Sequence, residues 1–505
     1  MSERTLNLGI LAHVDAGKTS LTERLLYAAG VIDEIGSVDD GTTQTDTLAL
    51  ERQRGITIKS AVTSFRIGDR AVNLIDTPGH PDFIAEVERV LSVLDGAVLV
   101  ISAVEGVQAQ THILMRALRR MRIPTLIFVN KIDRTGARSE RVLAQIADQL
   151  TAAAIPLGTV EHEGTKRAST RSAEPDASVL GEQDDAILAA YVTDAAISPK
   201  TLRRALRQQT RTAAVYPVLF GSAMTGAGIA SLIEAIPVLL PSSADGTGPA
   251  TGTVFKMERG PAGEKIAYLR MFSGTLSVRE RLDLGKVTGI AVFDRGATAP
   301  RARVTGGQIA KVWGLTGAKV DDSIGSPARS RHRFAPPALE AIVESPVAES
   351  PGARGALHAA LSLLAEQDSL INVRQDKNGD IRVSLYGDVQ KEVLQATLVD
   401  EFGLQVRFRD TQVRCIERPA GTGAAVQRIK QDGNLFLATI GLRVDPAPPD
   451  SGVAFRLEIE RGALPLAFIK AIEDTARRTL ADTTVTDCVV TLTESGYCPR
   501  QSHAH

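Results

Sequence analysis

A lysine and a threonine at the end of a short loop are the first residues whose types and spacing could do chemistry. The loop lies between an apolar run over 6–11, read as a buried strand, and an amphipathic run over 20–29, read as a helix. Such a loop presents backbone N–H groups and a helix N-terminus to one anion. Lys18 can then reach the β- and γ-phosphates of a nucleotide, and the Thr19 hydroxyl can bind Mg²⁺. Ala12 replaces the glycine of the strict pattern, so an ordinary strand–turn–helix is the alternative for this stretch alone. The predicted phosphate-binding loop consists of Ala12, His13, Val14, Asp15, Ala16, Gly17, Lys18 and Thr19.

A threonine and an aspartate further along have the arrangement of a nucleotide switch. A long polar loop over 36–54 leads to Thr57, and a later strand ends at Asp76. Asp76 would hold Mg²⁺, through water, as a Walker-B acid. Thr57 could bind the same ion only when a γ-phosphate is present, and Gly79 could offer that phosphate its N–H, so both loops would relax on hydrolysis. A strand-end threonine and a Pro-Gly turn are the structural alternatives. The predicted metal ligands are Thr19, Thr57 and Asp76, and the second switch loop is Asp76, Thr77, Pro78, Gly79 and His80.

Two further loops could read a guanine base. Asp133 can accept hydrogen bonds from guanine N1 and N2, whereas adenine lacks these donors and would leave the carboxylate unpaired in a desolvated pocket. Asn130 would hold neighbouring loops, the Lys131 stem would cover the base, and the backbone of Ser222 and Ala223 could bond O6. A lone Asn-Lys-x-Asp occurs by chance in loops, but five elements in the order of a GTPase predict GTP binding. The first of these loops consists of Asn130, Lys131, Ile132 and Asp133.

Length and composition predict a soluble, multidomain chain. Its 505 residues exceed one core, so three or four domains are expected. A formal net charge of −1 gives no global basic field, which argues against non-specific nucleic-acid coating while leaving a structured RNA partner open. Three scattered cysteines indicate a reducing compartment rather than a disulfide framework. Neither a signal peptide nor a membrane-spanning run is recognisable, so we expect a cytoplasmic protein without membrane contact.

Hydrophobic periodicity predicts a multidomain α/β architecture that begins with a P-loop GTPase domain over 1–240. Within it, 155–185 is read as a surface insertion. The predicted strands cover 6–11, 60–67, 71–75, 97–102, 125–129 and 215–220. The predicted helices cover 20–29, 82–94, 109–121, 139–153, 182–193, 199–208 and 229–239.

Three further domains are predicted after a linker over 241–250. Short strands with glycine turns over 251–330 predict a small β-barrel, and 336–411 reads as a ferredoxin-like α+β sandwich of the split βαβ type. An α+β domain follows over 412–505. The barrel strands are placed at 252–257, 266–274, 281–284, 307–312 and 318–320. The sandwich has strands at 338–344, 372–375, 381–386 and 404–408 and helices at 352–368 and 388–401. The last domain has strands at 433–444 and 453–460 and a helix at 465–480.

The forms of three loops resemble the translational GTPases. These forms are the 12–19 loop, Arg-Gly-Ile-Thr-Ile over 54–58, and Asp-Thr-Pro-Gly-His over 76–80. The resemblance implies that His80 orients or activates the attacking water once the ribosome positions it. It therefore adds His80 to Lys18 and Thr57 as the expected catalytic residues.

Within that family the sequence is similar to the tetracycline-resistance ribosomal protection proteins, which resemble elongation factor G. The stretch 41–57 carries this similarity, and the short segment 155–210 fits it, since elongation factor G usually has a larger insertion there. The family has a barrel as its second domain, and its fourth domain continues and is followed by a fifth. The fourth domain of this chain is therefore expected to be incomplete.

The resemblance implies a monomeric, ribosome-dependent GTPase that uses GTP and Mg²⁺, yields GDP, and releases tetracycline from the ribosome. Two alternatives stay open at this point. One is a translocase like elongation factor G, and the other is a GTP-dependent ribosome-binding module with little turnover. The sequence does not say which tetracyclines are affected, how tightly the ribosome is held, or what the 155–185 insertion does.

Overall fold

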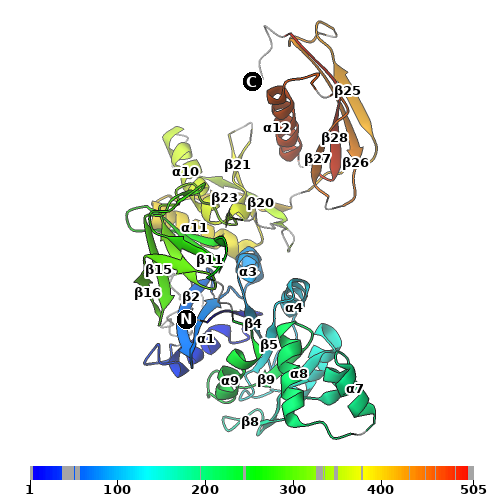
Figure 1. Cartoon of the computed structure of the whole chain (residues 1–505). Coiled ribbons are helices and arrows are strands. Elements are labelled where there is room, and N and C mark those ends of the chain that lie inside the picture. The colour runs from blue at the N-terminus through cyan, green and yellow to red at the C-terminus, as the bar shows by residue number, and fades with distance from the viewer. Residues whose placement is uncertain are drawn as a thin grey trace. The chain divides into compact units, whose positions relative to one another are not determined.

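The computed structural model divides the chain into two compact units, residues 1–411 and 412–505. It describes residues 4–36, 51, 57–193, 195–242, 246–325, 334, 336–345, 351–376, 379–413, 415–431, 433–449, 451–460, 462–483 and 485–498. The polar loop predicted over 36–54 lies outside these residues except for Gly36 and Glu51, as does most of the 41–57 stretch. Figure 1 shows the elements along the chain.

The first domain is built on a sheet of seven strands among the described residues, in the order β2-β3-β1-β4-β5-β9-β6. All pairs are parallel except β2 with β3. The strands are β1 (Thr5–Ala12), β2 (Ala61–Ile67), β3 (Arg70–Asp76), β4 (Gly96–Ser102), β5 (Thr125–Asn130), β6 (Ala154–Pro156) and β9 (Tyr216–Phe220). Every residue of β1, β4, β5 and β9 is buried, because helices cover both faces of such a sheet.

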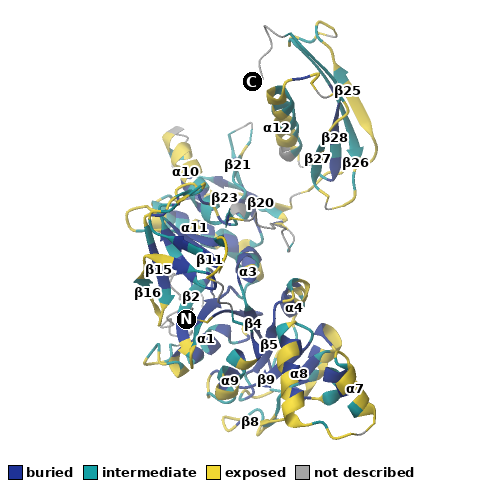
Figure 2. Ribbon diagram, in the orientation of Figure 1, coloured by how far each residue is buried: buried dark blue, intermediate teal, exposed yellow. Residues whose placement is uncertain are grey.

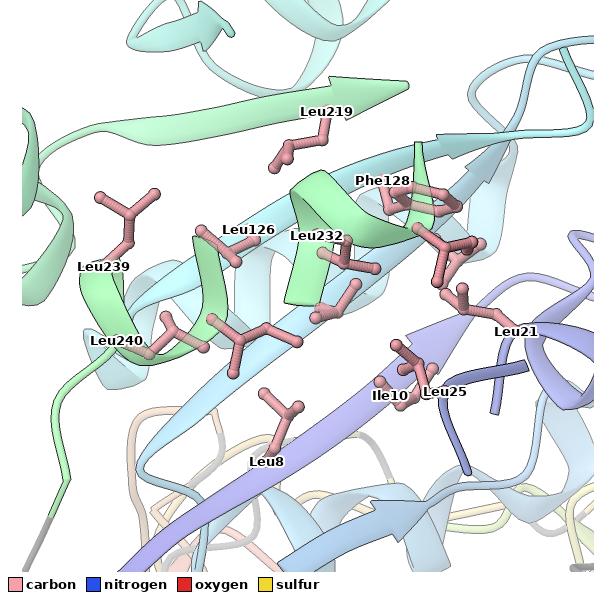
Figure 3. Packing of buried hydrophobic residues seen from close by; sticks show 14 of the residues in the cluster. Leu8, Ile10, Leu21, Leu25, Leu126, Phe128, Leu219, Leu232, Leu239 and Leu240 are labelled. Carbon is pink, nitrogen blue, oxygen red and sulfur yellow. The ribbon is translucent and has the colours of Figure 1, made fainter. Parts of the chain in front are cut away.

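Helices on the two faces form separate apolar cores. Figure 3 shows one of them, where leucines of α1 and α9 pack on Leu8, Ile10 and Phe128 of the sheet. The helices are α1 (Lys18–Ala28), α3 (Ile84–Leu91), α4 (Ala109–Met121), α5 (Ser139–Gln145), α6 (Ala177–Gly181), α7 (Asp185–Val192), α8 (Pro199–Arg211) and α9 (Ile229–Leu239). A short 3₁₀ turn, Pro81–Phe83, precedes α3, and a π turn, Ile146–Leu150, extends α5.

The insertion predicted over 155–185 is only partly a surface feature. Its first residues form β6, which adds a strand to the main sheet beside β9. Ile155 is fully buried there, so the apolar Ala-Ile-Pro triplet is core rather than loop. The remainder forms the hairpin of β7 (Gly158–Glu161) and β8 (Ser169–Ser172), followed by α6.

The second domain surrounds one apolar core with antiparallel strands. Six described strands follow the order β16-β15-β18-β11-β10-β19, and two short pairs, β12 with β17 and β13 with β14, accompany them. The strands are β10 (Thr251–Arg259), β11 (Lys265–Ser273), β12 (Thr275–Ser277), β13 (Arg281–Leu282), β14 (Gly285–Lys286), β15 (Gly289–Asp294), β16 (Ala297–Pro300), β17 (Arg303–Thr305), β18 (Ile309–Trp313) and β19 (Ser323–Ile324).

The strand predicted at 318–320 is wrong. Ala318 and Val320 are buried in the barrel core, but from a turn in which Ala318 N–H bonds Leu315 O and Asp321 has φ 74°. The edge strand is instead β19, which pairs with β10. Strands β12, β14, β15, β16 and β17 were not predicted. Strands β12, β14, β16 and β17 are short and mostly polar or small, whereas the apolar run of β15 was overlooked.

The third domain shows the predicted order of strand, helix, two strands, helix and strand. Its described strands follow the order β21-β22-β20-β23, and helices α10 and α11 share their apolar core. The elements are β20 (Leu339–Glu344), α10 (Pro351–Gln367), η3 (Ser369–Ile371), β21 (Arg374–Gln375), β22 (Ile381–Leu385), α11 (Asp388–Phe402) and β23 (Arg407–Phe408).

The second unit is a four-stranded sheet, as far as its described residues show, with one long helix. The strand order is β25-β26-β28-β27, and α12 connects the parallel pair β27 and β28. The sheet and its helix consist of β25 (Gly423–Gln427), β26 (Ala438–Pro446), β27 (Val453–Leu457), α12 (Leu466–Asp482) and β28 (Cys488–Tyr497), and the short strand β24 (Gln412–Val413) precedes them in the chain. Strands β25 and β28 were not predicted from the sequence, and β26 begins five residues later than predicted. Figure 2 shows that much of this unit is exposed or half-buried.

No described helix is both long enough and apolar enough to cross a lipid bilayer. The multidomain α/β fold predicted from the sequence is confirmed.

A buried polar network joins the second domain to the first. Arg270 of β11 is 2% exposed and donates to Asp95 Oδ1 at 2.9 Å and to Val93 O at 3.3 Å. The other oxygen of Asp95 accepts from the backbone and side chain of Asn7, at 2.9 and 2.6 Å. Asn7 in turn donates to Gly307 O of the barrel at 3.0 Å. The barrel is therefore fixed to β1 and to the segment that precedes β4 by charge and hydrogen bonds together.

Replacing Arg270 with alanine should lower the free energy of unfolding by roughly 3–5 kcal/mol, because it removes the cationic partner of a carboxylate in a desolvated site. Urea unfolding followed by circular dichroism measures this loss. The matched control is Arg281→Ala, an exposed arginine of the same domain, which should change stability by less than about 0.5 kcal/mol. Equal stability of the two variants would contradict the role given to the network.

Candidate functional site

A cleft of about 650 Å³ lies beside the loops that follow β1, β3, β5 and β9. Fourteen of the residues predicted from the sequence line it. They are His13, Val14, Asp15, Gly17, Lys18, Thr19, Thr57, Gly79, His80, Asn130, Lys131, Asp133, Ser222 and Ala223. The other predicted residues are buried and do not line the cleft. They are Ala12, Ala16, Asp76, Thr77, Pro78 and Ile132.

Gly17 gives the phosphate-binding loop its shape. It has φ 82° and precedes α1, so it takes the left-handed conformation that glycine adopts most readily. A Cβ on Gly17 would also lie 2.5 Å from Asn130 Nδ2. The Gly17 carbonyl accepts the first bond of α1, from Leu21 N–H at 3.0 Å. The loop therefore ends at a helix N-terminus, as an anion site requires.

Four side chains meet beside this helix N-terminus. The Lys18 ammonium forms a buried ion pair with Asp76 and donates to Thr57 Oγ1 at 3.2 Å. The hydroxyls of Thr19 and Thr57 are 3.4 Å apart. Residues 18, 57 and 76 come from three separate segments, and the structure brings their side chains together. Thr77 anchors the end of the strand by donating to Ile10 O at 2.8 Å.

Asn130 holds three loops together with its one amide group. Its Nδ2 donates to Ala16 O at 2.8 Å and to Gly17 O at 3.5 Å. Its Oδ1 accepts from Ala223 N–H at 2.9 Å. The phosphate-binding loop, the end of β5 and the loop after β9 are therefore fixed relative to one another by a residue that is 1% exposed.

The end of the cleft beyond Asn130 carries a carboxylate suited to a base. Among the described residues Asp133 Oδ1 is a buried oxygen without a hydrogen-bond partner, which suits an acceptor waiting for a donor pair. Lys131 has φ 66°, and its ammonium lies 3.3 Å from Glu105 Oε1, across the same end of the cleft. Ile132 N–H bonds Gly221 O at 3.3 Å and keeps this loop against the one after β9.

His13 is a buried imidazole at the start of the loop. Its Nδ1 is 3.1 Å from Thr111 Oγ1, and among the described residues its buried Nε2 has no hydrogen-bond partner. Burial lowers the pKa of His13 to about 4, with Lys131 adding to the effect and the carboxylates of Glu105 and Asp15 opposing it. The ring is therefore neutral at physiological pH.

His80 faces the cleft from the first residue before the 3₁₀ turn. Its Nδ1 accepts from Asp82 N–H at 3.2 Å, and Phe83 N–H bonds its carbonyl at 3.1 Å. Its ring lies 6.1 Å from the ring of Phe83. Since Nδ1 accepts, the neutral imidazole carries its proton on Nε2.

Several residues that shape the cleft were not predicted from the sequence. Arg24 of α1 donates to the carbonyls of Ala223 and Met224 and so holds the base-side loop from below. Glu51 accepts from Ile58 N–H at 2.9 Å and from Lys59 N–H at 3.0 Å, which fixes the chain just after Thr57. Arg24 was not predicted because a single arginine among the polar positions of an amphipathic helix is typical of a solvent-exposed face. The unpredicted residues that line the cleft are Ser20, Arg24, Ile35, Gly36, Glu105, Arg134 and Met224.

Two family models match the chain. The elongation factor Tu GTP-binding domain matches residues 3–242, and domain IV of elongation factor G matches residues 405–504. The first match contains every residue of the cleft described above.

Curated proteins match over almost the whole chain. An oxytetracycline resistance protein of Streptomyces rimosus is 50% identical over 97% of this chain and 79% of its own length. A tetracycline resistance protein TetM of Streptomyces lividans is 47% identical over 98% of this chain and 80% of its own. A tetracycline resistance protein TetP of Clostridium perfringens is 39% identical over 97% and 78%.

A solved structure shares the fold. A protein of Thermus thermophilus superposes with a TM-score of 0.69 at 23% identity, over 98% of this chain and 81% of that one. At this identity the similarity bears on the fold alone.

Asn130→Ala should weaken GTP binding by at least about 10-fold and lower the melting temperature, because Ala16 O and Ala223 N–H lose the hydrogen bonds that join their two loops through this side chain. Titration with a fluorescent guanine nucleotide and a thermal melt measure the two effects. Gln208→Ala, an exposed amide on α8, is the control and should leave both unchanged. If Asn130→Ala binds GTP with wild-type affinity, the loops keep their relative positions without this side chain and the prediction is wrong.

His13 should make the protein less stable in acid. Its pKa is lower in the folded chain, about 4 against 6.5, so the unfolded chain takes up a proton first as the pH falls. The stability that His13 contributes is complete above pH 6.5 and should decline by about 1.4 kcal/mol per pH unit down to the folded pKa. Urea unfolding at pH 7.5, 6 and 5 should therefore show a shallower decline for His13→Gln than for the wild type. His358→Gln, on an exposed histidine, should decline like the wild type, and parallel curves for His13→Gln would contradict the prediction.

Proposed function

Because this chain belongs to the tetracycline-resistance ribosomal protection proteins, a family of translational GTPases, we propose that it hydrolyses GTP on the ribosome and thereby releases bound tetracycline. One observation carries the proposal. A single cleft combines a phosphate-binding loop, Thr57 and Gly79 of the two predicted switch segments, the imidazole of His80 and the carboxylate of Asp133. The names of the relatives point to the same class of antibiotic.

The triphosphate would lie along the helix N-terminus at Gly17. Backbone N–H groups of the loop and the positive end of α1 stabilise its negative charge. Lys18 would exchange its contact with Asp76 for phosphate oxygens, since an ammonium contributes most where charge develops in the transition state. The hydroxyls of Thr19 and Thr57 and the carboxylate of Asp76 offer the hard oxygen donors that suit Mg²⁺ and would hold it. When bound, that ion would neutralise charge on the β- and γ-phosphates.

Asp133 would select guanine. Its buried Oδ1 can accept from N1–H or the exocyclic amine, and a base without those donors would leave it unpaired at a cost of several kcal/mol. The Ala223 N–H already bonds Asn130, so in this arrangement O6 would have to bond another backbone group of that loop.

His80 would orient the attacking water. The water oxygen bonds to the γ-phosphorus while the bond to the bridging oxygen breaks, and GDP leaves with that electron pair. The protons of the water end on the released phosphate or in solvent. With Nδ1 accepting from Asp82 N–H, the Nε2–H group of the ring would donate a hydrogen bond to the water rather than remove a proton at that atom. Turnover then requires the ring to point at the water, which is the step that ribosome contact would control.

Loss of the γ-phosphate would free Thr57 and Gly79 from their contacts with it. Both loops then lose one ordered arrangement, and the affinity for the ribosome changes with them. We infer that the protein acts as a monomer in the cytoplasm, where its ribosomal partner is found.

His80→Ala should reduce ribosome-stimulated GTP hydrolysis by roughly 10²- to 10³-fold at saturating ribosomes, with GTP affinity changed by less than about 3-fold. Phosphate release with and without ribosomes measures turnover, and displacement of radiolabelled tetracycline from the ribosomes measures drug release. The control is His358→Ala, which removes an exposed histidine far from the cleft in sequence.

The outcomes separate three functions. Stimulated hydrolysis with drug release supports the proposal, and stimulated hydrolysis without drug release favours a translocase, which would also support polypeptide synthesis. Tight binding to ribosomes without stimulated phosphate release would leave a binding module. Equal filling of the cleft by ATP and GTP would overturn the guanine assignment.

A further inference from the structure

The side chain of Asp82, in the GTPase domain, accepts hydrogen bonds from the third domain. Its Oδ2 accepts from Val389 N–H at 2.9 Å and from Gln390 N–H at 3.2 Å, in the first turn of α11. Asp82 is 9% exposed, so these bonds are shielded from water. A carboxylate at this position satisfies two N–H groups that have no partner within the helix, and it faces the positive end of the helix dipole.

Helix α11 has no N-terminal cap of its own. Its N-cap residue is Gly387, which offers no side-chain hydrogen bond. A Cβ on Gly387 would lie 2.3 Å from both carboxylate oxygens of Asp82. The backbone of Gly387 is extended, with φ −176°, so any residue could adopt it, and the three atoms nearest to an added Cβ all belong to Asp82. Asp82 therefore caps α11 from another domain, and the glycine at position 387 leaves room for its carboxylate.

The main chain of the same residue holds His80. The Asp82 N–H donates to His80 Nδ1 at 3.2 Å, and Asp82 Oδ1 lies 3.4 Å from that nitrogen. Both atoms belong to a three-residue 3₁₀ turn, Pro81–Phe83, in which Pro81 also restricts the backbone. A movement of the Asp82 carboxylate with α11 therefore displaces the group that fixes the imidazole ring.

A second contact holds the following helix to the same domain. Arg89 of α3 donates to Gln367 O at 2.9 Å and to Asp368 Oδ1 at 2.6 Å, at the C-terminal end of α10. Burial alone would lower the pKa of Arg89, but the carboxylates of Asp368 and Glu86 raise it above its usual value. The segment 82–89 thus meets the third domain through an anion at the start of one helix and a cation at the end of another.

We propose that Asp82 is a positioning residue for hydrolysis: held by the N-terminus of α11, it sets the orientation of the His80 ring according to the place of the third domain. This inference rests on the proposed role of His80. It adds a defined link through which a displacement of the third domain on the ribosome would reach the reacting water.

Two single substitutions break this link from opposite sides. Asp82→Ala removes the carboxylate, and Gly387→Ala introduces a methyl group that the carboxylate must avoid, 305 positions away in the chain. Each should lower ribosome-stimulated turnover by roughly 10- to 100-fold, while nucleotide affinity stays within about 3-fold of wild type. In the Asp82→Ala variant the methyl group of Gly387→Ala no longer meets a carboxylate, so the double variant should lose no more turnover than Asp82→Ala alone. Asp82→Asn keeps an acceptor oxygen and should restore much of the turnover.

The controls match the two chemistries. Asp69→Ala removes an exposed aspartate of the same domain, and Gly355→Ala adds a methyl group in α10 where nothing lies within 4 Å. Both should behave as wild type. The second readout is the pair of imidazole ¹⁵N resonances of His80, measured with Mg²⁺ and a non-hydrolysable GTP analogue and assigned by their absence in His80→Ala. Asp82→Ala and Gly387→Ala should both shift the Nδ1 resonance.

Each result bears on one of the two proposals. Shifted resonances with lost turnover and non-additive substitutions support the inference. Lost turnover with unshifted resonances, or additive losses in the double variant, would overturn it. Unshifted resonances with normal turnover would overturn it as well. Shifted resonances with normal turnover in these variants and also in His80→Ala would support the positioning of the ring by Asp82 and overturn the hydrolytic role of His80.

Discussion

The cleft depends on one side-chain amide. Asn130 donates to the phosphate-binding loop and accepts from the loop after β9, and both partners are main-chain groups. The left-handed Gly17 lets Asn130 approach closely, since a Cβ there would collide with Nδ2. A nucleotide that spans these loops binds them as one surface, because their relative positions are set before it arrives. The affinity that would otherwise be lost in ordering loops is retained.

The same principle extends from the cleft to the neighbouring domains. Arg270 and Asp95 fix the barrel beside the start of β4 in the central sheet. Lys256 of β10 donates to Ser60 O at 2.7 Å, three residues after Thr57. Ser60 in turn donates to Glu86 of α3 at 2.6 Å through its hydroxyl. Burial by itself would raise the pKa of Glu86, but Arg89, Lys256 and the bonds from Ser60 lower it. Both switch segments therefore end in one buried charged cluster shared with the barrel.

The sequence was informative where chemistry or burial is local. Strand β1 was recognisable because all of its residues are buried between helices, and the loops of the cleft were recognisable because phosphate and guanine restrict the residue types that can surround them. Residues whose role depends on distant partners gave no such signal. Arg24 meets Ala223 199 positions away, and Asp82 meets Val389 307 positions away. The prediction of a strand at 318–320 was wrong for a related reason, since an apolar residue can be buried in a core without belonging to a strand.

The way the third domain is attached favours a link that can move as a unit. In the third domain, Asp82 binds main-chain N–H groups at the start of α11, and Arg89 binds a main-chain carbonyl and Asp368 at the end of α10. These contacts are directional and largely buried. Arg89 keeps Glu86 as a partner when they break, whereas the Asp82 carboxylate loses both of its main-chain donors on α11. Intermediate arrangements are costly for that reason, and a small displacement of the third domain is converted into a change between discrete states. A histidine whose main-chain partner belongs to that link is then controlled by domain position without any contact between its own ring and the other domain.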